Sequence, residues 1–247
     1  MNYHDTLAKL GIGVAHPGGF QTTRQWIQHV NWPLIKEVVE IGCGTGRTAC
    51  HLASVYDLRV TGFDSRPLMI EKAKRRAKNT SIKKQIEFFV ADAHALPVPN
   101  RSVDLVYMES VSVFMDVELL FSEIYRMLRP GGKIIDVEMT RLFHIPDVLL
   151  TEIQEFYEAK QVPTIGEWKR QLQKAGFQNV RSLMMAGVAP GEESAFGNAD
   201  DWDQNQMITI LPHEMNDIQR VLQKNADLLE KTGPYLAYTV LTAESSL

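Results

Sequence analysis

The sequence has few cysteines, no long apolar run and no excess of basic residues, and each absence excludes a class of protein. Cys43 and Cys50 are its two cysteines among 247 residues, too few for a disulfide framework or a four-cysteine zinc site. No apolar run reaches the roughly 18 residues that a membrane span requires. The first ten residues lack the basic and apolar regions of a secretory signal, so we expect a cytoplasmic protein. The net charge of −4 gives no general reason to expect a nucleic-acid partner.

The remaining composition is that of an ordinary globular protein. Apolar residues make up 45% of the chain and charged residues 23%, so a buried core can form without a metal or a disulfide. The sequence contains no internal repeat and no low-complexity segment. We therefore expect a single domain over residues 1–247.

Residues 38–139 alternate short β-branched or aromatic runs with amphipathic segments. The predicted strands are Val38–Ile41, Leu58–Phe63, Ile86–Val90, Val103–Met108 and Lys133–Met139, and the predicted helices between them are Arg47–Tyr56, Pro67–Lys78 and Val117–Leu128. Strands that alternate with helices of this length favour an α/β fold with a parallel sheet covered on both faces.

The rhythm changes after residue 140. Further helices are predicted over Val148–Glu158, Ile165–Ala175 and Leu211–Leu229, and further strands over Val180–Met185 and Tyr235–Thr242. The helix Leu211–Leu229 carries an apolar stripe, which it must bury: Leu211, Met215, Ile218, Leu222 and Leu229. We interpret residues 1–30 as a lid segment and residues 141–165 and 187–233 as cap insertions, and expect them to select the substrate.

The most informative stretch is the glycine loop after the first strand, Glu40-Ile41-Gly42-Cys43-Gly44-Thr45-Gly46. Glycine lets a ligand lie against bare backbone, because it has no Cβ and tolerates positive φ. Dinucleotide enzymes use Gly-x-Gly-x-x-Gly at this point to bind a pyrophosphate. Here the spacing is Gly-x-Gly-x-Gly, and the Glu40 carboxylate would repel a pyrophosphate but suits a cofactor with an ammonium and a sulfonium. The other interpretation of the loop is a tight turn alone.

Other candidate ligands follow the next two strands. Asp64 ends the second strand, where a carboxylate accepts from both hydroxyls of a ribose, and Met69 offers a polarizable contact to an adenine face. Asp92 follows the third strand and can accept from an adenine amino group. Individually, these residues also suit a helix cap, a core methionine and a turn. Together they converge on one crevice, because the carboxyl ends of parallel strands meet at one edge of a sheet.

The chain resembles the class I S-adenosylmethionine-dependent methyltransferases, in particular the small-molecule branch that includes the ubiquinone and menaquinone biosynthesis enzymes. The matching motifs are Glu40–Gly46, Gly62-Phe63-Asp64-Ser65 with Met69, Ala91-Asp92-Ala93 with Leu96-Pro97, Asp104-Leu105-Val106, and Leu128-Arg129-Pro130-Gly131-Gly132. The resemblance implies a Rossmann-like, doubly wound sheet of seven strands in the order 3-2-1-4-5-7-6, with the last strand antiparallel.

The resemblance also implies roles for individual residues. Gly42, Cys43 and Gly44 would cradle the methionine portion of S-adenosylmethionine, and Asp64 would hold the ribose diol. Met69 and Asp92 would hold the adenine, and the backbone near Glu109 would hold the amino group. Glu40, Ser65 and Ala93 are further candidate cofactor contacts. The side chain of Glu109 leaves three interpretations open: a contact to the cofactor ammonium, a contact to a cationic substrate, or a turn cap.

Departures from related enzymes narrow the acceptor. Tyr107-Met108-Glu109-Ser110 stands where nucleobase-amine methyltransferases carry an Asn/Asp-Pro-Pro-aromatic turn, and no cluster of metal ligands is evident. His16 and His144 are candidate general bases, each with a structural role as the alternative. Ser112, Trp202 and Met207 are candidate contacts to the acceptor. The basic run from Lys72 to Lys84 has no interleaved aromatics, which favours a solvated helix face over a nucleic-acid surface.

The sequence thus predicts an enzyme that transfers a methyl group from S-adenosylmethionine to a small molecule by in-line displacement and releases S-adenosylhomocysteine. No metal is expected, and a homodimer is considered. Two alternatives stay open: a methyltransferase for a peptide or protein amine, and a non-catalytic S-adenosylmethionine-binding protein.

Overall fold

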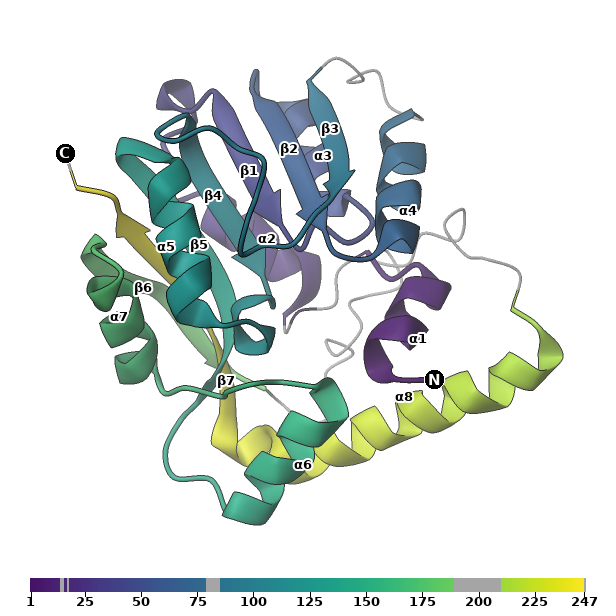
Figure 1. Ribbon diagram of the computed structural model, residues 1–247. Helices are drawn as coiled ribbons and strands as arrows, with labels where there is room; N and C mark the ends of the chain where they lie inside the picture. The colour runs from purple at the N-terminus through teal and green to yellow at the C-terminus, as the bar shows by residue number, and fades with distance from the viewer. Residues whose placement is uncertain (14–15, 17, 79–84, 189–209, 247) are drawn as a thin grey trace.

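Seven strands form one mixed sheet with helices on both faces, and their order β3-β2-β1-β4-β5-β7-β6 is the one predicted (Figure 1). The computed structural model describes residues 1–13, 16, 18–78, 85–188 and 210–246. β7 runs antiparallel to both of its neighbours, β5 and β6, as expected. The strands are β1 Glu37–Ile41, β2 Arg59–Asp64, β3 Ile86–Val90, β4 Val103–Glu109, β5 Leu128–Arg141, β6 Gln178–Gly187 and β7 Leu236–Glu244.

Two of the described helices, α1 and α2, were not predicted. The helices are α1 Tyr3–Leu10, α2 Gly19–Ile27, α3 Arg47–Val55, α4 Pro67–Lys78, α5 Val117–Met127, α6 Asp147–Tyr157, α7 Ile165–Lys174 and α8 Pro212–Thr232, with short 3₁₀ turns η1 Trp32–Leu34, η2 Ser112–Phe114 and η6 Gly233–Tyr235. Among these described helices, none is both long and apolar enough to span a membrane.

Alternation along the central strands builds a separate core on each face of the sheet. Val38 packs with residues of α2, α3 and α4, whereas Val39 packs on the opposite face with residues of α5 and α7. Glu40 follows this alternation onto the face of α3, and Ile41 returns to the other face. The strand pattern therefore places an acidic side chain within an apolar layer, directly before the glycine loop.

Three helices cover the carboxyl edge of the sheet, where α1, α6 and α8 lie against one another in Figure 1. Lys9 of α1 forms an ion pair with Glu214 of α8. The Tyr157 hydroxyl of α6 donates to Asn225 Oδ1 of α8 at 2.8 Å, and Asn2 Nδ2 donates to Glu158 Oε1 at 3.1 Å. Polar contacts between segments far apart in sequence thus hold α1 over the ends of the strands.

The predicted apolar stripe of α8 is wrong in its first turn. Leu211 is the N-cap rather than a helical residue, and the side chains of Leu211 and Met215 are 48% and 43% exposed. The buried residues of the helix are Ile218, Val221, Asn225, Leu228 and Thr232. Two of them are polar and are invisible to an apolar pattern: Asn225 binds Tyr157, and the Thr232 hydroxyl donates to the Leu228 carbonyl.

The expectation of a fully solvated basic face on α4 also needs correction. Lys72 is fully buried, and its Nζ lies 3.4 Å from the Lys9 carbonyl oxygen of α1. Arg76 Nε donates to the Thr45 carbonyl oxygen in the glycine loop at 2.9 Å. Both cations turn inward because the carbonyls that end α1 and the loop need donors.

Two adjacent leucines on α5 allow a matched test of the packing. Leu120 is fully buried, whereas Leu119 is 57% exposed. We expect Leu120→Ala to lower the free energy of unfolding by about 2–5 kcal/mol, because it leaves a cavity in the core. Urea denaturation of both variants measures this, and Leu119→Ala should stay within about 0.5 kcal/mol of the parent. Equal losses in the two variants would contradict the burial of this face.

Candidate active site

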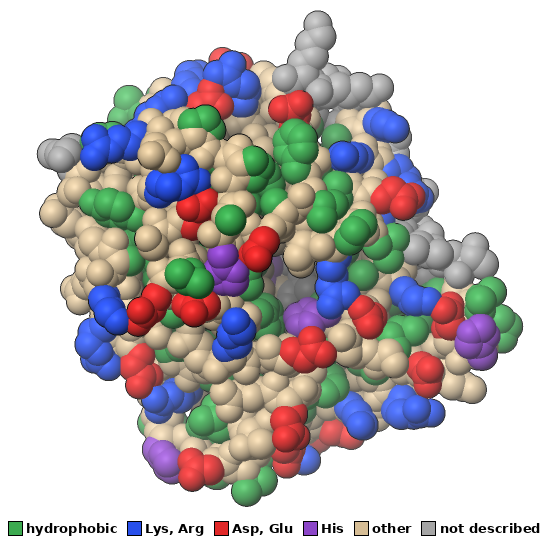
Figure 2. Space-filling model, in the orientation of Figure 1, with side chains coloured by type: hydrophobic (Ala, Val, Ile, Leu, Met, Phe, Trp, Pro, Cys, Tyr) green, Lys and Arg blue, Asp and Glu red, His purple; other side chains and the backbone are tan. Residues whose placement is uncertain are grey.

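A cavity of about 720 Å³ lies at the carboxyl ends of β1, β2 and β4. Figure 2 shows a hollow near the centre of the corresponding face, with histidine, acidic and basic side chains around it. Each of the ten residues predicted to bind cofactor lines this cavity: Glu40, Gly42, Cys43, Gly44, Asp64, Ser65, Met69, Asp92, Ala93 and Glu109. The structure therefore brings them together, while their roles remain predictions.

The glycine loop presents backbone to the cavity. Gly42, Gly44 and Gly46 have φ values of 70°, 51° and 71°, in the left-handed region that favours glycine. A Cβ added at Gly42 would lie 2.4 Å from Val111 Cγ2, so a side chain does not fit there. A Cβ added at Gly44 would meet no atom within 4 Å, which leaves open space beside the loop.

Asp64 joins this loop to the end of β2. Its Oδ2 accepts from the Gly44 amide at 2.9 Å, and its Oδ1 accepts from the Arg66 amide at 2.8 Å. Burial raises the pKa of Asp64, and these amides oppose the rise. Asp92, after β3, has a 71% exposed side chain that binds the His94 amide and ring, which lower its pKa.

Glu40 is a buried carboxyl group with one unsatisfied oxygen. Its side chain lies on the α3 face beside Tyr107, its partner in the β1–β4 register. Oε2 has no hydrogen-bond partner among the described residues. Burial raises the pKa of Glu40 well above its usual value, and the negative charge of Glu109 raises it further. The site thus contains a carboxyl group that a bound cation would stabilise in its charged form.

Glu109, at the end of β4, connects the sheet to the helices on that face. Its Oε1 accepts from Thr23 Oγ1 at 2.7 Å and Trp26 Nε1 at 2.9 Å, and its Oε2 accepts from Thr48 Oγ1 at 2.9 Å. His16 Nε2 lies 3.2 Å from Thr23 Oγ1 and 3.5 Å from Glu109 Oε1. The carboxylate therefore binds α2 and α3, a function that none of the three interpretations of Glu109 included.

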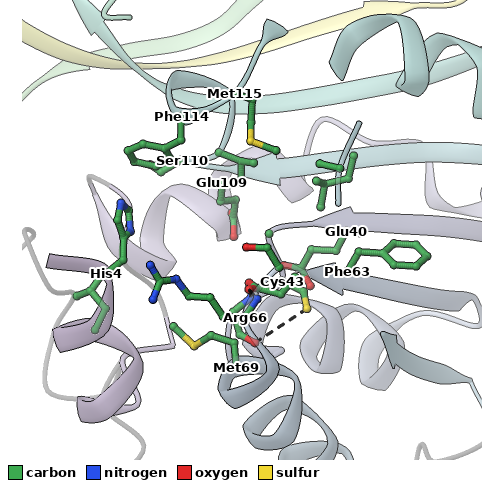
Figure 3. A pocket seen from close by; sticks show the side chains of 18 of the residues that line it. His4, Glu40, Cys43, Phe63, Arg66, Met69, Glu109, Ser110, Phe114 and Met115 are labelled. Carbon is green, nitrogen blue, oxygen red and sulfur yellow. Dashed lines mark hydrogen bonds between the residues drawn. The ribbon is translucent and has the colours of Figure 1, made fainter. Parts of the chain in front are cut away.

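The outer part of the cavity is lined by residues that the sequence analysis missed: Tyr3, His4, Leu7, Phe114, Met115 and Glu158. Figure 3 shows His4 and Phe114 next to each other on one side of the cavity, with Arg66 pointing towards α1. The ring centroids of His4 and Phe114 lie 4.8 Å apart, and the two ring planes meet at 90°. A signal for α1 was present, because Asn2 is a suitable N-cap and Tyr3, Leu7 and Leu10 have helical spacing.

Two predicted site residues, His144 and Ser112, do not line the cavity. His144 is exposed and does not line it. Ser112 is fully buried beneath it, where its hydroxyl donates to Asp136 Oδ2 at 3.0 Å. Trp202 and Met207 lie outside the described residues. Within the part of the chain that the structure describes, no three His, Cys, Asp or Glu side chains are grouped as metal ligands.

Two buried carboxyl groups of β5 support the loop after β4. Glu138 Oε1 accepts from the amides of Val111 and Ser112, and Asp136 binds the Ser112 hydroxyl. The supported residues, Val111 and Ser112, come directly after Ser110, which has a φ of 57° and lines the cavity. Burial raises the pKa values of both acids, that of Asp136 to about 7, and the negative charge of Asp136 further raises that of Glu138.

The comparisons with known proteins agree with this geometry. Residues 38–132 match the model of a family described as "Methyltransferase domain". An uncharacterized methyltransferase of Bacillus subtilis, YodH, is 27% identical over 98% of both chains. Phosphoethanolamine N-methyltransferase 1 of Arabidopsis thaliana is 30% identical over 69% of this chain and 34% of its own length.

Solved structures show the same fold. Phosphoethanolamine N-methyltransferase 2 of Haemonchus contortus, solved with S-adenosylmethionine, superposes with a TM-score of 0.76 at 19% identity, over 99% of this chain and 57% of that one. The sheet order, the cavity and these matches define a Rossmann-like methyltransferase. Residues 38–132 therefore carry a methyltransferase domain, and the chain as a whole is similar to the class I S-adenosylmethionine-dependent methyltransferases. The names of the phosphoethanolamine N-methyltransferases state a small-molecule substrate, and these matches do not favour the peptide-amine or non-catalytic alternatives.

The buried acids of β5 predict a pH-dependent stability. The pKa of Asp136 is about 7 in the folded protein and about 3.9 in the unfolded chain. The protonated carboxyl group therefore contributes its full stability below the unfolded pKa, and this part of the free energy of unfolding is lost as the pH rises towards about 7. We expect Asp136→Asn to flatten the decline in unfolding free energy between these values. Urea denaturation across this range measures it, with Asp57→Asn, whose side chain is 88% exposed, as the control. An unchanged slope in Asp136→Asn would contradict the account.

Proposed function

We propose that the inner part of the cavity, lined by the glycine loop, Glu40, Asp64 and Met69, binds S-adenosylmethionine. The outer part, under α1, binds the methyl acceptor. The observation that carries the proposal is the pairing of open space at Gly44 with the unsatisfied Glu40 oxygen a few residues before it. Bare backbone accommodates the methionine portion, and a buried carboxyl group suits its cationic groups. The residues present therefore fit this cofactor.

The individual roles follow from the geometry of the inner part. Asp64 keeps acceptor capacity beyond its two amide bonds, and carboxylate oxygens suit a ribose diol. Met69 and Ala93 offer apolar contacts for the adenine, and Asp92 and Ser65 offer polar ones at the rim. Glu109 already accepts three hydrogen bonds, so we assign the ammonium to Glu40 and to the backbone near Glu109.

When bound, S-adenosylmethionine supplies a methyl carbon that its sulfonium activates for displacement. The task of the protein is then to align the acceptor and to exclude water. Tyr3, Leu7 and Phe114 form an apolar wall for this purpose, with Met115 beside them. Residues 1–30 contribute α1, and residues 141–165 contribute Glu158 at the end of α6, which supports their predicted part in acceptor selection.

The proposed acceptor is a small organic molecule that bears an amine or a hydroxyl group. A mostly apolar chamber with a few polar groups suits such a ligand. The chain spans about a third of the length of the plant phosphoethanolamine N-methyltransferases it resembles, and their acceptor chemistry favours an amine. Methylation assays with small amines, phenols and thiols, against a peptide amine, test this by the S-adenosylhomocysteine formed.

The proposal also covers the cellular location of the protein and its macromolecular partners. The free, buried thiols of Cys43 and Cys50 suit a reducing compartment, which supports the cytoplasm. We propose no nucleic-acid partner, because Lys72 and Arg76 of the basic helix α4 point inward to carbonyl groups. A homodimer stays a prediction that sedimentation of the purified protein tests.

Two substitutions test the assignment of the inner part. Gly44→Val should abolish S-adenosylhomocysteine binding, because branched carbons would fill the open space beside the loop. Asp64→Ala should weaken binding by about 1.5–3 kcal/mol, the scale for a hydrogen bond to a charged group. Calorimetry measures both affinities, and Asp57→Ala, an exposed carboxylate outside the cavity, is the control. Parent-like affinity in both folded variants would show that the cofactor binds elsewhere.

A further inference from the structure

His4 presents one ring nitrogen that the fold uses and one that it does not. The residue lies in the first turn of α1 and lines the outer part of the cavity. His4 Nε2 lies 2.9 Å from the carbonyl oxygen of Tyr157. A carbonyl oxygen only accepts, so Nε2 carries the proton and donates it. Nδ1 is then the ring atom with a lone pair, and within the described part of the chain it has no hydrogen-bond partner.

The surroundings of His4 keep the ring neutral. Burial is the largest effect and lowers its pKa, and the Arg66 guanidinium lowers it further. The Tyr157 carbonyl and the carboxylates of Glu158 and Asp5 oppose this change. Phe114 packs edge-on against the ring from η2 and contributes no charge. Since the net pKa lies below the usual 6.5, His4 is unprotonated near neutral pH.

The other histidines of the site are less suited to receive a proton from an acceptor. The buried His16 ring lies against the hydroxyl of Thr23 and the carboxylate of Glu109, within the connection between α2 and β4. The His94 ring binds Asp92 through Nδ1 at 2.8 Å, in the part of the cavity assigned to adenine. The exposed His144 does not line the cavity. His4 is the histidine that faces the outer part with a fixed tautomer.

We propose that His4 Nδ1 is the general base that removes the proton of the methyl acceptor. The proposal rests on the function assigned above, because it needs an acceptor in the outer part of the cavity. The acceptor nitrogen or oxygen forms a bond to the methyl carbon, while the carbon–sulfur bond breaks and its electron pair stays on sulfur. The acceptor proton moves to Nδ1, and the resulting imidazolium still donates from Nε2 to Tyr157. Nearby Glu158 and Asp5 stabilise its positive charge, and solvent receives the proton before the next turnover.

The first test reads the ring itself and needs no acceptor. Nitrogen-15 NMR of the full chain, with resonances assigned through His4→Gln, should show a neutral His4 ring protonated at Nε2. Its pKa should lie below 6.5 in the presence of S-adenosylhomocysteine as well. A ring protonated at Nδ1, or one that is charged at pH 7, would overturn the proposal whatever the enzyme methylates.

The second test uses His4→Gln, whose amide can still donate to the Tyr157 carbonyl but cannot take a proton. With the amine or phenol that gives the most S-adenosylhomocysteine, we expect kcat to fall by about 10²- to 10⁴-fold, the usual contribution of a general base. The fall in kcat on the acidic side of the pH profile, where His4 of the parent takes up a proton, should disappear. The deficit should shrink as the pH approaches the pKa of the acceptor, because the acceptor then loses its proton to solvent. His29→Gln, at an exposed histidine outside the cavity, is the matched control.

The affinity for S-adenosylhomocysteine separates this proposal from the one on which it rests. His4→Gln should bind it within about twofold of the parent, because the ring lies outside the inner part. Unchanged kcat and an unchanged fall in kcat on the acidic side would overturn the role of His4 while leaving the cofactor site intact. Loss of cofactor binding in the parent protein would instead overturn the proposed function.

Discussion

The hydrogen bonds that the Glu109 carboxylate accepts are the interaction on which the placement of α2 and α3 beside the cavity depends. The carboxylate stands at the carboxyl end of β4 and accepts three hydrogen bonds, from Thr23 and Trp26 of α2 and from Thr48 of α3. A largely buried carboxylate is costly unless donors surround it, and here the donors come from segments 61 to 86 residues away. One carboxylate at the strand end thus fixes α2 and α3 in one arrangement.

This arrangement divides the cavity between two tasks. The glycine loop, Asp64 and Glu40 belong to the sheet and its first crossover, where parallel strands converge and the geometry is rigid. Tyr3 and His4 belong to α1, which polar contacts to α6 and α8 hold over the strand ends. The part of the cavity that belongs to the sheet can therefore stay the same between related proteins while the helices above it differ, which is how one fold serves many acceptors.

Much of the fold and of the inner site was predictable from the sequence, and the reasons are local. Strand runs, helical spacing and the glycine loop are read within ten to twenty residues, and ten candidate ligands of the inner part do line the cavity. The sheet order came from the resemblance rather than from the residues. Contacts across long separations were not predictable: His4 with Tyr157, and Glu109 with Trp26. For the same reason His144 and Ser112 were placed wrongly, since a position after a strand does not reveal which side chain faces the cavity.

The central claim is that the glycine loop and its buried acids bind S-adenosylmethionine rather than a dinucleotide. Equilibrium binding of the unmodified protein to S-adenosylhomocysteine and to NAD, measured side by side by calorimetry, tests it most directly. The account predicts saturable binding of one S-adenosylhomocysteine per chain and no binding of NAD, whose pyrophosphate would add negative charge beside Glu40 and Glu109 in place of the cation that stabilises a charged Glu40. Binding of NAD without any signal from S-adenosylhomocysteine would contradict it.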